Sequence, residues 1–430
     1  MRRRRVLIVS YVFPPLVAGG APRMGQFARL LPEFGWDVTV VTAKHVGIDA
    51  DAVAALDGRT KIVATWSPST IVPRGTPSPK LGIRGWVRKT LRTAALSVMF
   101  PDREVFWAPG AIRAGKAALA EAPHDVVFAT YGPASDLVVG RALARAAGLP
   151  LVVDFRDLWS TLPIPRFTTA LHRAAAHRLE RGIVRDASRV IAVAPHMAED
   201  LAREHGIADA HAISITNGFD PDDASRVRDG RPSSPDRPFR LMYVGSVNAN
   251  YDLEPFWHAI RELARSGRVT PETLRIEFVG NLALSDARSL GVDGFVDVMP
   301  FVPHAEVFDQ LARADAVFMI ETPGYYARYS YAAKVFDYLL TGKPVLALVE
   351  PGGNTSRLLA EAGVGYEANP SDPIAVAAAL ERVLALKGRP PRHVDCNAPP
   401  FAAFNRRNLV RRLAATLDEV AATEPRGHWN

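Results

Sequence analysis

The stretch VLIVSYVFPPLVAGG occupies residues 6–20, close to the start of the chain. Its first half is a continuous apolar run, which is typical of a strand buried on both faces of a parallel sheet. Two prolines end the run, and the pair Gly19–Gly20 follows before a helical stretch begins near Pro22. Glycine permits close backbone approach, and a helix N-terminus attracts anions. This corner therefore suits a phosphate site, although a tight turn or a hinge would have the same sequence.

Short apolar runs alternate with amphipathic stretches along the rest of the chain, as in parallel sheets covered by helices. Strands are expected first at 6–13, 37–43, 61–66, 125–131, 151–155, 190–194 and 212–216. After a segment rich in Asp, Ser, Arg and Pro they resume at 239–245, 274–280, 294–301, 316–321, 343–349 and 363–369. The pattern predicts two Rossmann-like domains, 1–222 and 239–400, joined by a linker at 223–238. An amphipathic helix within 401–430 is expected to pack back on the first domain.

Composition excludes several classes of protein. A length of 430 residues suits two domains of about 200 residues each. The single cysteine, Cys396, excludes a disulfide framework and a cysteine-based zinc site. No apolar run approaches the ~20 residues of a membrane span, and no signal peptide is visible. We therefore expect a soluble cytoplasmic protein.

The net charge is +7 and comes mostly from arginine. Such an excess indicates solvated faces or a preference for anionic substrates or an anionic membrane surface. No basic patch interleaved with aromatic residues is present, so a nucleic-acid partner is not expected.

Five different motifs follow one another along the chain in a characteristic order. They are LLPEFGWDVTVVTAK (30–44), FPDREVFWAP (100–109), LVVDFRDLWS (151–160), ITNGFD (215–220) and KVFDYLLTGKPVLA (334–347). Together with the early FPP…GG loop they resemble the family 4 glycosyltransferases of the GT-B fold, over nearly the whole chain. The resemblance implies an α/β protein with two Rossmann-like domains facing across a cleft. It also implies transfer of a sugar from a nucleotide sugar to an acceptor, with retention of configuration and without a metal or other cofactor.

In the first domain, the resemblance places Gly19 and Gly20 at the donor diphosphate and sugar. Asp154 stands nearest the end of a strand, where ligands of open α/β sheets bind, and is the predicted catalytic carboxylate near the acceptor or the sugar. The predicted acceptor-side residues are Arg23, Tyr131, Arg156 and Asp157. In glycosyltransferases with lipid-linked acceptors, a basic element such as 81–100 can rest on an anionic membrane; an ordinary surface helix is the alternative.

In the second domain, Asp337 matches the second of two family glutamates, which binds both ribose hydroxyls. The first glutamate would fall at Tyr329, so it is lost. The family's Arg–Lys pair beyond Gly245 is also missing, since Val247–Tyr251 contains neither. We therefore predict that Lys334 and Arg328 neutralise the diphosphate. The remaining predicted nucleotide-sugar contacts are Gly245, Ser246, Gly280, Phe301, Val302, Tyr331, Ala332 and Ala333.

Three functions stay open at this stage. The first is a retaining hexosyltransferase using a UDP or GDP sugar, in which the leaving phosphate takes the acceptor proton. Its acceptor is a surface polysaccharide or lipid-linked glycan, or else a small-molecule natural product, as in antibiotic biosynthesis. The second is a nucleotide-sugar 2-epimerase on the same fold. The third is a degenerate, non-catalytic partner subunit, suggested by the missing glutamate and Arg–Lys pair.

Overall fold

The computed structural model describes residues 2–14, 20–44, 58–68, 99–162, 169–227, 237–247 and 251–423. Gly19, Asn248–Asn250 and residues 81–98 of the basic stretch lie outside these ranges. The chain divides into two compact units. Unit 1 combines Met1–Thr216 with Leu409–Asn430, and unit 2 is Asn217–Asn408. The first unit thus ends a few residues before the position 222 expected from the sequence.

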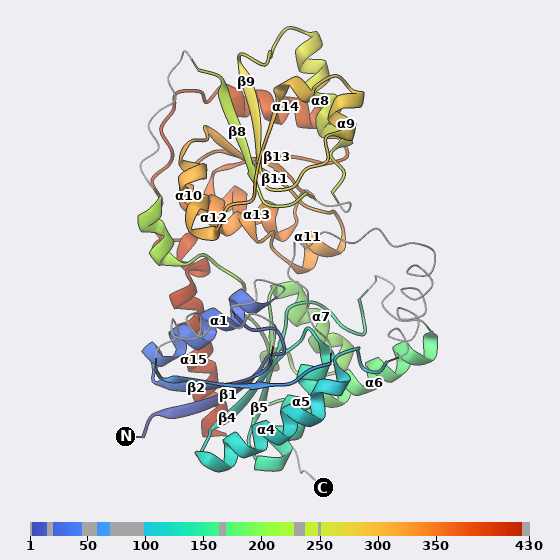
Figure 1. Cartoon of the computed structure of the whole chain (residues 1–430), viewed down its shortest axis with the longest axis vertical. Coiled ribbons are helices and arrows are strands. Elements are labelled where there is room, and N and C mark those ends of the chain that lie inside the picture. The colour runs from blue at the N-terminus through green and yellow to red at the C-terminus, as the bar shows by residue number, and fades with distance from the viewer. Residues whose placement is uncertain are drawn as a thin grey trace. The chain divides into compact units, whose positions relative to one another are not determined.

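Unit 1 contains a parallel sheet of seven strands in the order β3-β2-β1-β4-β5-β6-β7 (Figure 1). The strands are β1 Arg4–Val9, β2 Trp36–Ala43, β3 Thr60–Thr65, β4 Val126–Thr130, β5 Leu151–Phe155, β6 Arg189–Ala192 and β7 Ala212–Ser214. The central strands β4 and β5 are buried along their whole length, which explains their uninterrupted apolar sequences.

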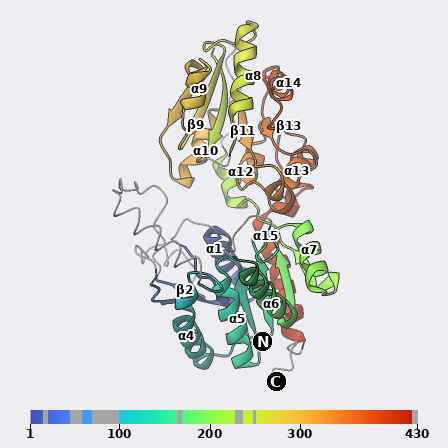
Figure 2. The same ribbon diagram turned by 90° about the vertical axis from the view of Figure 1, so that its right-hand side faces the viewer.

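The helices of unit 1 cover both faces of this sheet. They are α1 Ala21–Leu30, α4 Ala108–Glu121, α5 Ala134–Ala147, α6 Ala170–Asp186, α7 Pro195–His205 and α15 Arg406–Ala422, with the short 3-10 helices η1 Leu31–Phe34, η2 Val105–Trp107 and η3 Asp209–His211. The helices α4 and α5 lie side by side (Figure 1, Figure 2). The helix α15 comes from the far end of the sequence, yet its apolar stripe of Leu409, Leu413, Leu417 and Val420 belongs to the same core as β1 and β2.

Unit 2 contains a second parallel sheet, of six strands in the order β10-β9-β8-β11-β12-β13. The strands are β8 Phe239–Val244, β9 Leu274–Val279, β10 Val296–Met299, β11 Ala316–Ile320, β12 Val345–Leu348 and β13 Gly365–Ala368. The helices are α8 Glu254–Arg265, α9 Ser285–Ser289, α10 His304–Ala312, α11 Tyr325–Tyr329, α12 Lys334–Thr341, α13 Asn354–Ala362 and α14 Pro373–Leu384, with η4 Pro221–Arg226, η5 Asp293–Phe295 and η6 Phe401–Phe404. One apolar core lies under α8 and α14, and a separate core lies under α10, α12 and α13.

All thirteen strands expected from the sequence are present, each ending within about four residues of its predicted bounds. Two Rossmann-like sheets are therefore confirmed. In each sheet the strand order reverses once, between β1 and β4 in unit 1 and between β8 and β11 in unit 2. Ligands of open α/β sheets bind at the carboxyl ends of the strands at such a reversal. The search for a functional site therefore starts at these two places.

No helix in the described ranges is both long enough and apolar enough to cross a membrane.

Candidate active site

At the strand reversal of unit 1, Gly20 immediately precedes α1 and lies against the side chain of Arg156. A Cβ atom on Gly20 would stand only 1.8 Å from Nη1 of Arg156, so no other residue fits there unless the arginine moves. The Arg156 guanidinium donates from Nε to the carbonyl of Tyr131 at 3.0 Å and from Nη2 to the carbonyl of Gly132 at 2.7 Å. It thereby joins the loops after β4 and β5 to the glycine corner.

Among the described residues no carboxylate lies at salt-bridge distance from Arg156. The hydrogen bonds of its guanidinium go to the backbone carbonyls of Tyr131 and Gly132. Burial lowers the pKa of Arg156, while Asp154 and Asp136 oppose that shift from further away. A guanidinium remains charged in proteins, so the corner beside Gly20 carries a fixed positive charge. The sequence predicts Arg156 on the acceptor side, and in the structure its guanidinium lies beside Gly20, which is a predicted phosphate contact.

Arg23 and Asp154 form a buried ion pair. Nη2 of Arg23 donates to Oδ1 of Asp154 at 2.7 Å and Nε donates to Oδ2 at 3.3 Å, with both side chains 5% exposed or less. Arg23 also donates to the carbonyls of Ile215 and Thr216, and Oδ2 of Asp154 accepts from the hydroxyl of Thr130. Both side chains were predicted to contact substrate. In the structure they hold α1, β5 and the end of β7 together, and Asp154 is fully buried.

A second buried carboxylate, Asp136, lies in the first turn of α5. It is 0% exposed, its Oδ2 accepts from the Tyr11 amide at 2.9 Å, and its Oδ1 has no hydrogen-bond partner in the described ranges. Burial raises the pKa of Asp136 well above the usual value of a carboxylic acid. The sequence analysis passed over this residue, because nothing local distinguishes it from an ordinary acidic residue in a first helical turn.

At the strand reversal of unit 2, three predicted residues from distant parts of the sequence come together. Gly245 follows β8 with φ +120°, and a Cβ there would lie 2.6 Å from Cε of Lys334. Gly280 follows the neighbouring strand β9, and a Cβ there would lie 2.4 Å from the Gly245 carbonyl oxygen. The first residue of α12 is Lys334, whose Nζ donates to the Tyr243 hydroxyl at 2.8 Å. These contacts form a glycine corner with an ammonium group beside it.

Burial lowers the pKa of Lys334 to about 8, and the charge of nearby Asp337 opposes the shift. The Nζ atom also lies 4.5 Å from the centre of the Tyr243 ring, a cation–π contact. The tyrosine hydroxyl in turn donates to the Ser246 carbonyl at 3.3 Å. The lysine is therefore held in one position by uncharged partners, and its charge is poorly compensated. That arrangement suits the binding of an anion.

Residues 18–218 match the family described as the glycosyl transferase 4-like domain. This glycosyl transferase 4-like domain covers just under half of the chain, and the chain as a whole has the GT-B fold. The chain is 25% identical over 392 residues to a protein named glycogen synthase from Mycobacterium tuberculosis, with 88% of this chain and 86% of the relative covered.

Two solved structures share the fold of this chain. A glycosyltransferase from Rickettsia africae aligns with a TM-score of 0.64 and 12% identity, covering 98% of this chain and 100% of that one. A sucrose-phosphate synthase from Thermosynechococcus elongatus aligns with a TM-score of 0.60 and 17% identity, covering 97% and 96% of the two chains. At such low identity these likenesses concern the fold only.

The loop that carries Arg328 is hydrogen-bonded to the start of α13. Nδ2 of Asn354 donates to the Arg328 carbonyl at 2.8 Å, and the Ala332 amide donates to Oγ1 of Thr355 at 3.2 Å. The Thr355 hydroxyl donates to Oε1 of Glu321 at 3.0 Å. Of the three predicted nucleotide-sugar contacts in this loop, Tyr331, Ala332 and Ala333, the second therefore already uses its backbone amide within the protein.

Glu321 is a functional candidate that the sequence analysis missed. It directly follows the last residue of β11 and is 5% exposed. Its Oε2 atom has no hydrogen-bond partner among the described residues. Burial raises its pKa to about 7, and the Thr355 hydrogen bond opposes that shift. Only its position directly after an apolar strand could have indicated it.

The other predicted residues take varied positions. Ser246, Phe301 and Arg328 are exposed. The Tyr131 side chain is buried, and its ring stacks on the Trp159 ring with 5.9 Å between the ring centres. Half-buried positions are occupied by Asp157, Val302, Tyr331 and Asp337, and Ala333 is exposed. In the described ranges no group of three or more His, Cys, Asp or Glu side chains could hold a metal ion.

Proposed function

We propose that this glycosyltransferase moves a hexose from a UDP or GDP sugar to a glycan acceptor, with retention of configuration and without a metal. The observation that carries the proposal is the ammonium of Lys334, held against the glycine corner of Gly245. Family 4 enzymes of this fold generally use nucleotide-sugar donors. A charged group fixed before the reaction begins stabilises developing negative charge without reorganisation.

The proposed roles follow from the two corners. Lys334 and Arg328 neutralise the leaving diphosphate, and Asp337 accepts hydrogen bonds from the ribose hydroxyls. Arg156 adds positive charge beside Gly20. The bond between the anomeric carbon and the phosphate oxygen breaks while the acceptor oxygen forms its bond on the same face. The acceptor proton passes to the departing phosphate oxygen, so no protein nucleophile is required.

A sugar polymer or a lipid-linked glycan is the proposed acceptor. The glycogen synthase relative supports a sugar acceptor because its name describes extension of a glucose polymer. No relative reported above supports a natural-product acceptor.

The proposal is tested in two steps. Thermal shift with UDP and with GDP identifies the base, because a ligand of the folded state raises the melting temperature. Release of nucleotide diphosphate is then compared between wild type, Lys334→Ala and the control Lys387→Ala, which changes an exposed lysine after α14. We expect Lys334→Ala to lose about 2–4 kcal/mol of transition-state stabilisation in kcat/KM, and the control to lose none.

Two other results would contradict the proposal. Formation of an epimerised donor without free nucleotide would indicate a nucleotide-sugar epimerase. Nucleotide binding without release from any donor would indicate a non-catalytic subunit.

A further inference from the structure

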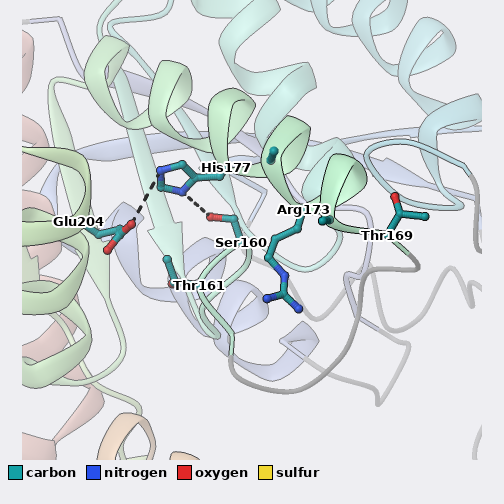
Figure 3. Close-up of a pocket in the computed structure, with 8 residues that line it drawn as sticks. Ser160, Thr161, Thr169, Arg173, His177 and Glu204 are labelled. Carbon is teal, nitrogen blue, oxygen red and sulfur yellow. Dashed lines mark hydrogen bonds and ion pairs between the residues drawn. The ribbon is translucent and has the colours of Figure 1, made fainter.

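A pocket of about 530 Å³ lies in unit 1 between the loop after β5, the first half of α6 and the last turn of α7 (Figure 3). Its volume falls within the range of small-molecule sites. The polar side chains that line it are Ser160, Thr161, Thr169, Arg173, His177 and Glu204. The roles proposed above make no use of this pocket.

The wall of the pocket is fastened in place by Ser160. The Ser160 amide donates to Oε2 of Glu180 at 2.8 Å, and the Ser160 hydroxyl is hydrogen-bonded to Nδ1 of His177 at 3.1 Å. Glu180 and His177 are one turn apart on α6, so both bonds attach the loop to one helix face. The His177 ring also stacks on the buried His205 at 5.3 Å between ring centres. A ligand would therefore meet a preformed surface.

The pocket contains one cation, Arg173, and one carboxylate, Glu204, and among the described residues only the carboxylate has a side-chain partner. Nε2 of His177 lies 3.8 Å from Oε1 of Glu204, so this carboxylate is directed at the imidazole (Figure 3). The side chain of Arg173 is exposed and forms no ion pair or hydrogen bond with any other described residue. Figure 3 shows its side chain extending from α6 on the side of Ser160. The pocket also lies at the amino end of the 17-residue helix α6, where the helix dipole is positive.

We infer that this pocket binds a phosphate or carboxylate group carried by the acceptor sugar, with Arg173 as its charge partner. The hydroxyls of Thr161 and Thr169 supply hydrogen bonds to the same group or to the sugar. The inference rests on the proposed function and specifies its acceptor. Thr161 stands on the same loop as Arg156, which lies at the Gly20 corner, so an acceptor anchored here is held by the loop that also reaches the proposed donor site.

The test measures binding of three probes to the full chain by calorimetry: glucose 6-phosphate, glucuronate and glucose. Wild type is compared with Arg173→Ala, with Thr161→Val and with the control Arg178→Ala, which removes an exposed arginine of α6 that does not line the pocket. We expect an anionic probe to bind at least tenfold more weakly to Arg173→Ala, detectably more weakly to Thr161→Val, and unchanged to the control. The probe that binds more tightly shows whether the group is a phosphate or a carboxylate.

Equal binding of glucose and the anionic probes, or anion binding unaffected by Arg173→Ala, would overturn the inference. Thermal shift with UDP and GDP on the same variants separates the two proposals. If wild type binds neither nucleotide, the proposed function fails. If every variant binds the nucleotide normally and Arg173→Ala binds the anionic probes as tightly as wild type does, only the inference about the acceptor fails.

Discussion

The pH dependence of the proposed sugar transfer should be set by Lys334. Burial lowers the pKa of this amine to about 8 from its usual 10.5, and the proposed reaction needs the amine charged. In the free enzyme the charged fraction therefore falls above pH 8, and kcat/KM should decline about tenfold per pH unit beyond that point. A bound diphosphate favours the charged amine and raises its pKa, so the decline in kcat should begin at higher pH.

The matched variant is Lys334→Arg, because a guanidinium stays charged throughout this range. The assay measures release of the nucleotide diphosphate between about pH 6.5 and 10. For this variant, kcat/KM should show no decline near pH 8. Melting temperatures across the same range verify that the variant is folded. A flat wild-type profile, or a decline that persists unchanged in Lys334→Arg, would refute the assignment.

The same shift predicts a stability effect of defined sign. Because the folded-state pKa of Lys334 lies below the unfolded value, the unfolded chain binds more protons between pH 8 and 10.5. The free energy of unfolding should therefore rise with pH across this window, by up to about 3 kcal/mol for this lysine. Lys343, which burial also brings to a pKa of about 8, adds a shift of the same sign. The difference between wild type and Lys334→Met isolates the contribution of Lys334.

Three further predictions concern the rest of the molecule. Arg23→Ala leaves the fully buried Asp154 unpaired and should lower the free energy of unfolding by about 3–5 kcal/mol in urea titrations; a loss under 1 kcal/mol would contradict a buried ion pair. Gly20→Ala displaces the Arg156 guanidinium, so nucleotide release should drop at least tenfold with little change in melting temperature, and full activity would argue against this corner. Treatment with EDTA should leave the rate unchanged, and recovery on adding Mg²⁺ after a loss would show a metal requirement.

The strands and the unit 2 corner were accessible from the sequence. Each buried strand is a continuous apolar run, and the glycines after β8 and β9 stand where such runs stop. Lys334 could be selected because it was a cation in the strand–loop–helix segment that resembled the family's nucleotide site. Its contact with Gly245 follows from the neighbouring positions of β8 and β11 in the sheet.

The partners of the charged side chains in unit 1 were not accessible. Arg23 and Asp154 are 131 residues apart, and either could have faced solvent or substrate as far as local pattern shows. The position of the Arg156 guanidinium depends on its hydrogen bonds to the Tyr131 and Gly132 carbonyls in the loop after β4. Glu321 likewise depends on a hydroxyl from α13. Side-chain direction at the ends of strands is decided by packing across the sheet, which single-sequence periodicity does not report.

The helix α15 has a consequence for how this protein is made. Unit 2 is one uninterrupted segment of chain, whereas unit 1 receives part of its core from residues after Leu409. Domains generally fold as units as the ribosome delivers them. Unit 1 is synthesised first, but its core is complete only after α15 has emerged from the ribosome. Unit 1 therefore completes its folding after unit 2. Until then the face of its sheet that meets Leu413 and Leu417 stays uncovered. A chaperone that recognises nascent apolar surfaces would have its longest opportunity at that face.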